Sequence, residues 1–369
     1  MNILTLNIGS STVKYAVFSS ALHLKEEKLR FKGIIDKIKN NSGYIKAINE
    51  IVRIIRKNEI KIDIIGHRIV HGGQIRESCL INTKIERIIK KYSEFAPLHN
   101  PPELIGIKEC KRIFRVKQVA VFDTAFFSEL PERSFLYALP YKYYEKHSIR
   151  KYGFHGISHK YCSIRASEIL KKELKKLKLI TCHLGNGCSI SAIKYGKCID
   201  TSMGLTPLEG LVMGTRTGDI DVGTVLYLMK KEHLGLERMN RILNKESGLL
   251  GISGISNDFR VLLNTKKQRA RLAIDVFTYR LVKYIGAYIS ALQGADAIVF
   301  TGGIGENSSE IRELVLNNFE FNGLKLDKNL NQKNAEKITK KDSKISALAI
   351  KTDEERCIAK DVIEGLNKT

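Results

Sequence analysis

The sequence predicts a two-lobed α/β protein whose halves are related by a distant internal duplication. Its 369 residues exceed the roughly 250–300 residues that one hydrophobic core usually serves, so two lobes with a cleft between them are expected. Short apolar runs at residues 62–65 and 119–122 end at polar residues, as buried strands of α/β sheets do, and residues 45–55 have helical periodicity. A pattern of strand, glycine turn and strand occurs twice, at residues 3–18 and 177–193.

The two copies of this pattern are similar in kind rather than in sequence. In the first, the apolar residues 3–6 and 13–18 flank the turn Asn-Ile-Gly-Ser-Ser, which predicts a hairpin. In the second, residues 177–183 and 190–193 flank Leu-Gly-Asn-Gly-Cys-Ser. Each copy therefore predicts the opening hairpin of one lobe.

The last part of the chain predicts a helix, a strand and a final helix. Residues 271–293 have apolar positions at helical spacing, and they precede a predicted strand at 297–301 and a glycine turn at 302–305. Residues 353–355 supply the acidic first turn of a helix whose apolar stripe runs from residue 358 to 366.

The net charge of +23, from 62 Lys and Arg against 39 Asp and Glu, raises the question of a nucleic-acid partner. Basic residues gather in amphipathic stretches such as residues 171–178, without interleaved aromatic residues or a helix-turn-helix or zinc pattern. We interpret them as solvated faces and expect no nucleic-acid partner. Their field would still attract anionic substrates.

The apolar segments predict a cytoplasmic protein with no membrane partner. The longest, residues 285–300, is interrupted by Gln293 and Asp296 and is shorter than the roughly 20 residues of a membrane span. Residues 1–8 lack a basic leader region, so we interpret them as a strand.

The seven cysteines are expected to be reduced thiols. Their number is odd and none lies in a Cys-x-x-Cys pair. Metal binding by Cys182 and Cys188 near His183 is a weaker alternative, because the spacing lacks the short paired loops of zinc sites.

Three glycine turns follow predicted strands, at residues 7–12, 185–189 and 302–305. Such turns bring backbone N–H groups close to phosphate, although a tight hairpin explains a single one equally well. The chain lacks the G-x-x-x-x-G-K-[ST] pattern and a G-x-G-x-x-G after its first strand, which disfavours Walker and Rossmann sites.

Two arginines lie between glycines, Arg68 within residues 66–73 and Arg216 within residues 214–219. Arginine pairs with a carboxylate or phosphate through two hydrogen bonds, and glycines leave room for a ligand. Two such arginines could neutralise a phosphoryl group during transfer. A structural salt bridge is the alternative interpretation of Arg68.

Two histidines and two acidic residues elsewhere in the chain are further candidates for catalytic or metal-binding roles. His155 and His159 are spaced i, i+4 but lack the Glu of a zinc protease, so we predict that His155 stabilises charge and that His159 belongs to the core. Asp123 follows a predicted strand and is a candidate for orienting a substrate or Mg²⁺. Glu354, at the start of the last helix, is a second metal candidate unless it only complements the helix dipole.

These segments resemble acetate kinases, within the superfamily of actin, the heat-shock chaperone ATPases and hexokinase. The matching motifs follow the family's order at residues 7–11, 66–73, 96–101, 122–126, 152–159, 183–187, 213–221, 253–256 and 300–307.

The resemblance implies two duplicated ribonuclease H-like (actin-like ATPase) domains with a nucleotide cleft between them. Residues 1–127 with 356–369 would form the first domain and residues 128–355 the second. It also implies a homodimer that converts ATP and acetate reversibly to ADP and acetyl phosphate, with Mg²⁺ as cofactor and Mn²⁺ able to replace it. A carboxylate is already ionised at neutral pH, so direct in-line transfer needs no general base.

The resemblance also assigns roles to residues. The catalytic set is Asn7, Arg68, Asp123, His155 and Arg216, in which His155 and Arg216 stabilise the transition state. Asn7 and Glu354 bind the metal, and His99 and His183 line the cleft. The acid contacts Arg68, Val70, Leu98, Phe154 and Pro207. ATP contacts Lys14, His183, Gly185, Asn186, Gly187, Asp258, Phe259, Arg260, Gly303, Ile304, Gly305 and Asn307.

The chain departs from the family pattern at Asp353, which replaces a usual Asn, at Gly302, which replaces Ala, at Asn257, which replaces a small residue, and at Pro102. Asp353 could add negative charge near the metal. The chain is also somewhat shorter than typical members.

Two alternatives to acetate kinase remain. A propionate or butyrate kinase would use the same phosphate machinery. A nucleotide-switched binding protein is disfavoured, because glycine-framed arginines suit acyl phosphate chemistry and no peptide-binding domain follows.

Overall fold

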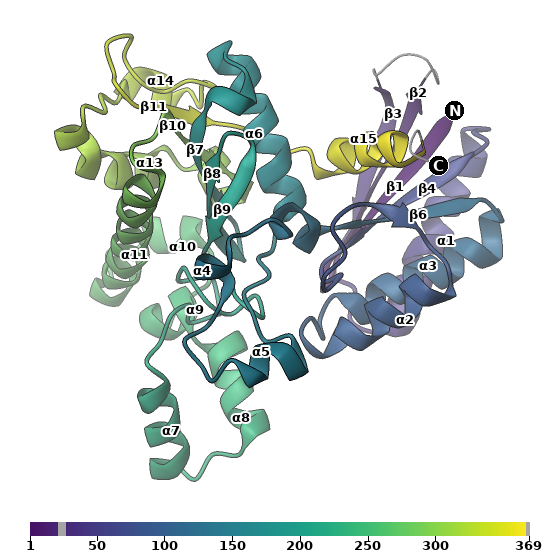
Figure 1. Ribbon diagram of the computed structural model, residues 1–369, viewed down its shortest axis with the longest axis horizontal. Coiled ribbons are helices and arrows are strands. Elements are labelled where there is room, and N and C mark those ends of the chain that lie inside the picture. Colours follow the sequence, from purple (N-terminus) through teal and green to yellow (C-terminus); the bar gives the residue numbers. More distant parts are fainter. Residues whose placement is uncertain (21–26, 367–369) are drawn as a thin grey trace. The chain divides into compact units, whose positions relative to one another are not determined.

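The computed structural model describes residues 1–20 and 27–366 (Figure 1). Contacts within the chain divide it into two compact units. The first consists of Met1–Ser128, Phe154–Tyr161 and Asp353–Thr369, and the second of Glu129–Gly153 and Cys162–Thr352.

The first unit contains a six-stranded sheet in the order β3-β2-β1-β4-β6-β5. The three strands β1, β2 and β3 form an antiparallel meander, β4 and β6 continue it in parallel with β1, and β5 is antiparallel at the edge. Their bounds are β1 (Asn2–Ile8), β2 (Val13–Ser20), β3 (Glu27–Ile35), β4 (Ile64–Ile69), β5 (Cys79–Leu80) and β6 (Lys117–Phe122).

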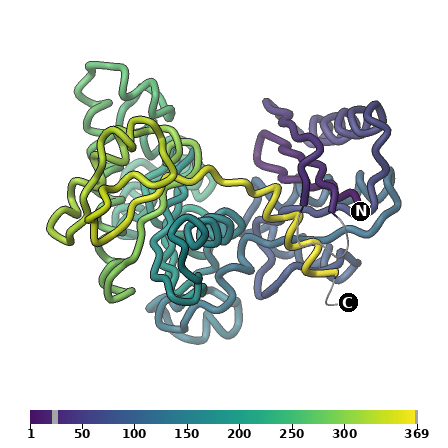
Figure 2. Tube along the Cα trace, turned by 90° about the horizontal axis from the view of Figure 1, so that it is seen from above, coloured from purple at the N-terminus to yellow at the C-terminus, as the bar shows by residue number. Residues whose placement is uncertain are grey.

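Helices cover both faces of this sheet. Alternate residues of a strand point to opposite faces, so Leu4 and Leu6 of β1 pack in the cluster with α1, whereas Ile3 packs in the cluster with α15. Figure 2 shows the last helix, in yellow, beside the purple first strands. The helices are α1 (Asn41–Lys57), α2 (Thr83–Lys91), α3 (Asn100–Phe114) and α15 (Glu354–Leu366).

The second unit contains a five-stranded sheet in the order β11-β10-β7-β8-β9. Here β7, β8 and β9 form the antiparallel meander, and β10 and β11 extend it in parallel with β7. The strands are β7 (Lys178–Leu184), β8 (Cys188–Lys194), β9 (Lys197–Thr201), β10 (Ala297–Thr301) and β11 (Ser346–Ala349).

The long helix α11 (Gln268–Leu292) packs against this second sheet. Its buried residues Phe277, Leu281 and Ile285 recur every four positions and so share one helical face. The other helices are α4 (Glu132–Phe135), α5 (Lys142–His147), α7 (Val222–Lys231), α8 (Leu236–Arg241), α9 (Gly248–Ser253), α10 (Phe259–Leu263), α12 (Gly302–Asn307), α13 (Ser309–Leu316) and α14 (Lys328–Gln332). The residues of α6 (Gly156–Leu170) are divided between the two units.

The two sheets share one topology, because β3-β2-β1-β4-β6 and β9-β8-β7-β10-β11 follow the same order and directions. This agreement confirms the internal duplication predicted from the opening hairpins. The glycine turn predicted at residues 302–305 was wrong in form, since these residues open the helix α12. The N–H of Gly302 donates to Glu306 Oε1 within this helix, so a phosphate at this end would use the N–H groups of the residues that follow.

The domain boundaries predicted from the sequence stay a prediction. They differ from the contact-based units chiefly at residues 154–161, which the structure groups with the first unit. Within residues 1–20 and 27–366, no helix combines the length and hydropathy that a membrane crossing requires.

Arg312, on α13, is a fully buried cation that joins three elements of the second unit. Its guanidinium donates to the carbonyls of Gly305 and Glu306 in α12, and to the side-chain and backbone oxygens of Asn331 in α14. Burial lowers the pKa of Arg312 to about 10, so it stays charged at neutral pH. These hydrogen bonds therefore fix the position of α12 within the second unit.

We expect Arg312→Met to destabilise the protein by about 3 kcal/mol or more, because five carbonyl or amide oxygens, Asn334 Oδ1 among them, would lose their donor. Urea unfolding followed by far-ultraviolet circular dichroism measures this, since the chain has no tryptophan. The control is Arg165→Met, whose exposed pairs with Glu168 and Glu336 should be worth less than about 1 kcal/mol. Equal losses in the two variants would contradict the prediction.

Candidate functional site

Three polar side chains of the first unit meet at the carboxyl ends of its parallel strands. Asn7 lies near the end of β1, Arg68 near the end of β4, and Asp123 directly after β6. The register pairs Leu6 with His67 and Arg68 with Val121, which brings the three to one sheet edge. Ligands of α/β sheets bind at such edges.

Arg68 is the centre of this group. Its Nη2 and Nε atoms donate to Asp123 Oδ2 at 2.7 and 3.2 Å, and Nη1 donates to Asn7 Oδ1 at 3.0 Å. Burial would lower the pKa of Arg68, but the carboxylates of Asp123, Glu354 and Glu103 outweigh it and raise that pKa. Arg68 therefore stays cationic. The salt bridge that the sequence offered as the alternative interpretation of Arg68 is present, with Asp123 as its partner.

Asp123 depends on Arg68 in return. Its side chain is fully buried, and this burial raises the pKa of the carboxyl while the guanidinium of Arg68 opposes the rise. The other oxygen, Oδ1, accepts the backbone N–H of Ile157 at 3.3 Å. The carboxylate thus anchors residues 154–161 to the first unit.

Asn7 connects Arg68 to the first turn of α15. Its Nδ2 donates to Glu354 Oε2 at 2.6 Å and to Glu355 Oε1 at 3.1 Å. Burial, and then the neighbouring Glu354, raise the pKa of Glu355. Asp353, which the sequence marked as a departure, lies next to Glu354. Its carboxylate accepts the backbone N–H and the Nε–H of Arg356, so its negative charge is already paired.

The oxygen atoms of Asn7 and Glu354 suit Mg²⁺. No cluster of three or more His, Cys, Asp or Glu side chains that could hold a metal occurs in the described ranges 1–20 and 27–366, and this includes the region of Cys182, Cys188 and His183. Mg²⁺ usually takes one or two protein carboxylates and completes its shell with water and phosphate oxygens. The carboxylate of Glu354 fits that mode, whereas Asn7 Oδ1 already accepts a hydrogen bond from Arg68 and would have to share that oxygen with the ion.

The glycines around Arg68 serve packing more than ligand access. A Cβ atom at Gly66 would lie 2.7 Å from Val362 and 2.8 Å from Ile358, both on α15. The expectation that these glycines keep the space around the arginine open is therefore wrong for Gly66. Its missing side chain lets α15 approach β4 closely.

The four residues predicted to surround the methyl group of the acid are all apolar. Val70 and Phe154 are buried, and the Phe154 ring meets the His71 ring edge-on with centroids 5.5 Å apart. Leu98 lies in the turn before α3 and is 40% exposed. Pro207, the fourth residue predicted to contact the acid, belongs to the second unit.

His155 follows Phe154 with a φ of +57°, the left-handed region that non-glycine residues rarely adopt. Such strain concentrates at functional positions. By contrast, His159 is fully buried with its ring 6.0 Å from that of Phe127, as the core interpretation predicts.

The second unit has a hollow of about 760 Å³ where the β7–β8 turn, α10 and α12 come together. This volume suits a ligand of nucleotide size. Eight residues predicted to contact ATP line it, namely Gly185, Asn186, Asp258, Phe259, Arg260, Gly303, Ile304 and Asn307. His183, Gly187 and Gly305 belong to the same unit without lining it, and Lys14 belongs to the first unit.

Further lining residues were not predicted. They are Asn257, Leu263, Asn264, Ser308 and Glu310. Asn257, noted from the sequence only as a departure, donates its amide to Asn186 Oδ1 at 3.1 Å. Exposed polar residues of this kind give no periodic signal, so only the fold reveals them.

Arg216 lies in a loop that is hydrogen-bonded to the same turn. Gly214 N–H donates to the carbonyl of Asn186 at 3.1 Å, and a Cβ at Gly214 would lie 2.4 Å from Asn186 Oδ1. The Arg216 Nη1 donates to the Pro207 carbonyl at 3.1 Å, and burial lowers the pKa of this arginine. Gly214 is thus needed because a side chain at this position would prevent the Arg216 loop from approaching the β7–β8 turn so closely.

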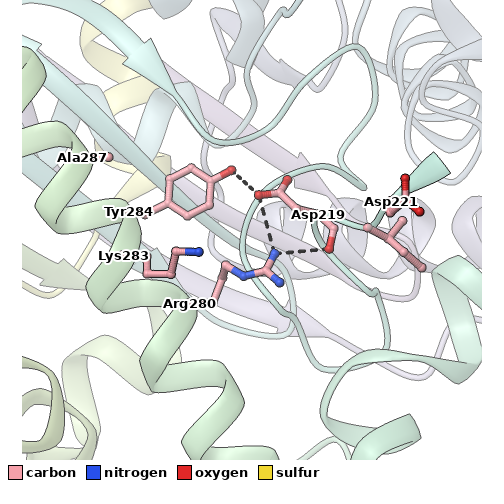
Figure 3. Close-up of a pocket in the computed structure, with 7 residues that line it drawn as sticks. Asp219, Asp221, Arg280, Lys283, Tyr284 and Ala287 are labelled. Atoms are coloured by element: carbon pink, nitrogen blue, oxygen red, sulfur yellow. Dashed lines mark hydrogen bonds and ion pairs between the residues drawn. The ribbon is translucent and has the colours of Figure 1, made fainter. Parts of the chain in front are cut away.

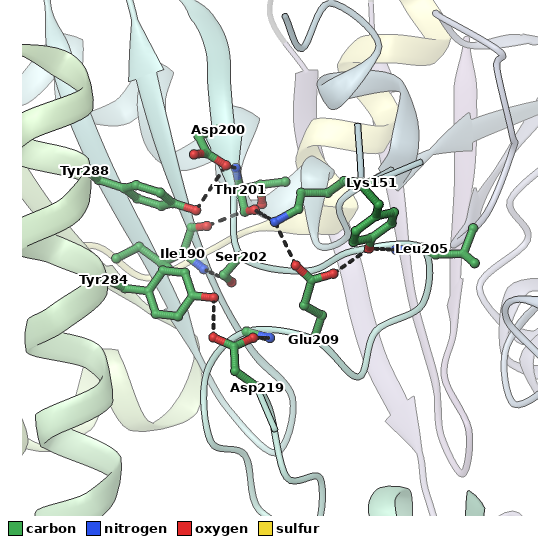
Figure 4. Close-up of polar contacts among 12 residues, drawn as sticks. Lys151, Ile190, Asp200, Thr201, Ser202, Leu205, Glu209, Asp219, Tyr284 and Tyr288 are labelled. Carbon is green, nitrogen blue, oxygen red and sulfur yellow. Dashed lines mark hydrogen bonds and ion pairs between the residues drawn. The ribbon is translucent and has the colours of Figure 1, made fainter. Parts of the chain in front are cut away.

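A polar network supports this loop from α11 (Figure 4). Tyr284 donates to Asp219 at 2.7 Å, and Asp219 also accepts the Gly210 N–H at 2.7 Å. Glu209 pairs with Lys151 at 2.9 Å. Figure 3 shows the side of Asp219 that faces Arg280, where a hollow of about 440 Å³ opens.

Another of the sequence departures, Gly302, has a local cause. It has a φ of +76°, and a Cβ there would lie 2.7 Å from the Leu184 carbonyl oxygen. Alanine would strain this conformation.

Known proteins are similar to this chain over its whole length. The model of the acetokinase family matches residues 40–360. The acetate kinases of Caldicellulosiruptor saccharolyticus and Thermoanaerobacterium thermosaccharolyticum are 46% and 47% identical, with 100% and 99% of this chain and 100% of each relative covered.

Solved structures agree. The crystal structure of Porphyromonas gingivalis acetate kinase is 39% identical with a TM-score of 0.87 and covers 99% of both chains. That of a propionate kinase from Francisella tularensis is 40% identical with a TM-score of 0.88 and covers 98% of both. These similarities confirm the predicted two-domain actin-like ATPase fold. The chain belongs to the acetokinase family, a family of phosphotransferases whose acceptor is a carboxylate.

Proposed function

We propose that this protein is an acetate kinase, which transfers the γ-phosphoryl group of ATP reversibly to acetate and yields ADP and acetyl phosphate. The observation that carries this proposal is Arg68, whose side chain is only 11% exposed and is held by Asp123 and Asn7, two positions before the apolar Val70. A cation held in this way suits the carboxylate of a short acid.

Arg68 would bind the acid carboxylate, with Val70, Leu98, Phe154 and Pro207 around its methyl group. Asp123 would hold Arg68 in position and orient the substrate. The acid is already anionic, so its oxygen attacks the γ-phosphorus directly and ADP leaves with the bridging oxygen. No residue has to remove a proton.

The hollow of the second unit would bind ATP. Its glycine turn and the start of α12 line the hollow, which supports phosphate contacts from Gly185, Asn186, Gly303 and Ile304. The N–H of Gly185 itself donates to the Gly187 carbonyl. We assign contacts with the rest of the nucleotide to Asp258, Phe259, Arg260 and Asn307, and further contacts to Lys14, His183, Gly187 and Gly305.

Arg216 and His155 would stabilise the charge that spreads over the phosphoryl oxygens in the transition state. Asn7 and Glu354 would hold Mg²⁺, and Mn²⁺ could replace it. When bound, the ion neutralises phosphate charge. We place the enzyme in the cytoplasm, where ATP is supplied.

Propionate kinase is the second candidate, because a propionate kinase is among the structures most similar to this chain. Butyrate kinase ranks below both, since the predicted acid surface is small.

The direct test is an acetate-dependent hydroxamate assay with ATP and Mg²⁺, which detects acetyl phosphate. We expect activity in the wild type, and we expect Arg68→Ala and Arg216→Ala each to lower kcat by about 100-fold or more. The first variant loses the cation that orients the attacking carboxylate, and the second loses positive charge beside the phosphoryl group in the transition state. Arg165→Ala, on an exposed ion pair, is the control and should keep full activity. An unaffected kcat in either active-site variant would remove that arginine from the mechanism.

Acid selectivity tests the apolar surface. We expect kcat/KM to fall from acetate to propionate to butyrate by about 10-fold or more per methylene, since one methylene changes binding by about 1–3 kcal/mol. Val70→Ala should reduce the difference in kcat/KM between acetate and propionate, because the smaller side chain leaves more room for the acid. A wild-type preference for butyrate would overturn the assignment to acetate.

We propose a homodimer, supported by the apolar surface of α7. No residue of α7 is buried, and its Val222, Leu226 and Tyr227 are 68%, 63% and 62% exposed. Light scattering after size exclusion should give twice the chain mass of 41.7 kDa, and Leu226→Asp with Tyr227→Asp should halve it by placing charge on that surface. A separate double variant, Lys230→Ala with Lys231→Ala, is the control. It changes the charge of α7 but not its apolar residues, so it should remain dimeric. A monomeric wild type would contradict the proposal.

A further inference from the structure

Glu103 is a buried carboxyl group beside the acid-binding residues. It lies in the first turn of α3 and is 1% exposed. Both of its oxygens accept the backbone N–H of Val70, at 3.2 and 3.3 Å. None of the ion pairs found among residues 1–20 and 27–366 includes Glu103, so this group is bound by a neutral donor.

The neighbouring Asn100 strengthens the same attachment. Its Oδ1 accepts the His71 N–H at 3.1 Å, and its Nδ2 donates to the His71 carbonyl at 2.9 Å. The start of α3 therefore holds two consecutive residues that follow Arg68 by two and three positions. Any change in the first turn of α3 reaches the acid-binding segment through these hydrogen bonds.

Among residues 1–20 and 27–366, three titratable groups interact electrostatically with Glu103. Arg68 approaches from β4, Asp123 from the end of β6, and Tyr44 from α1. Burial raises the pKa of Glu103 to about 8, while Arg68 and the Val70 N–H oppose the rise and Asp123 adds to it. The group is thus protonated at neutral pH and becomes anionic as the pH rises through about 8.

The charge of Glu103 acts on the cation that would bind the acid. Asp123 and Glu354 already act electrostatically on Arg68. Ionisation of Glu103 adds one more negative charge to the same cation, and it would compete with a carboxylate substrate. In a water-poor site such a charge alters anion binding strongly.

We propose that Glu103 is a positioning residue for the acid: its protonated carboxyl holds the Val70 segment and leaves the charge of Arg68 to the substrate, and its ionisation weakens acid binding. This inference rests on the proposed function, because it assumes that Arg68 binds the acid. Above the titration range, binding of one carboxylate is then coupled to the uptake of one proton by Glu103.

The experiment compares KM and kcat for acetate from about pH 7 to about pH 9, at saturating ATP and Mg²⁺. In the wild type, we expect KM for acetate to rise about threefold or more across this range, while KM for ATP stays constant. Glu103→Gln keeps an oxygen for the Val70 N–H but has no charge to gain, so its KM for acetate should stay flat.

Glu109→Gln is the matched control. Glu109 lies on the same helix and pairs with Arg112 at the surface, so this variant should keep the wild-type profile. A flat wild-type profile, or an equal rise in Glu103→Gln, would overturn the inference. A wild type inactive toward every acid would overturn the proposed function itself, and the inference with it.

Calorimetry on the wild type provides a second measurement that needs no variant. Acetate binding at about pH 8.5, in buffers of different ionisation enthalpy, should show uptake of a large fraction of a proton, and much less at about pH 7. Equal proton uptake at the two pH values would overturn the inference even if Glu103→Gln did not fold.

Discussion

The ion pair between Arg68 and Asp123 is the interaction on which the first unit depends. It joins two parallel strands at their carboxyl ends, and through Asn7 it reaches β1 and the first turn of α15. Each partner is buried, and each would be costly without the other, because an uncompensated charge in a protein interior loses several kcal/mol. The pair therefore fixes the geometry of the strand ends and holds the cation to which we assign the carboxylate substrate.

The second unit obtains its candidate nucleotide site by different means. Its hollow is formed by backbone turns and helix starts, and its close packing depends on Gly214 beside the side chain of Asn186. Arg312 secures α12 from the opposite side with hydrogen bonds to carbonyls. Charged contacts thus hold the candidate site of the first unit together, whereas backbone geometry forms the hollow of the second.

Local environment changes the meaning of several residues that seem equivalent in the sequence. Asp353 and Glu354 are adjacent acids, yet the first is paired with Arg356 and the second accepts from Asn7. Glu103 is the first-turn acid of α3, a position usually explained by the helix dipole, but it is buried against Val70. Its protonation at neutral pH follows from that burial.

The sequence by itself determined the duplicated α/β architecture, because apolar periodicity and the repeated hairpin pattern are local properties of the chain. It also singled out Arg68, Asp123 and Asn7, since ordered motifs and glycine neighbours mark them. Only the tertiary structure decided that these three touch, that Gly66 serves the packing of α15, and that Asn257 and Glu103 belong beside the candidate sites. The physical reason is that burial and contact depend on residues distant in the chain: Glu103 is 33 residues from Val70, and Asn7 is 347 from Glu354.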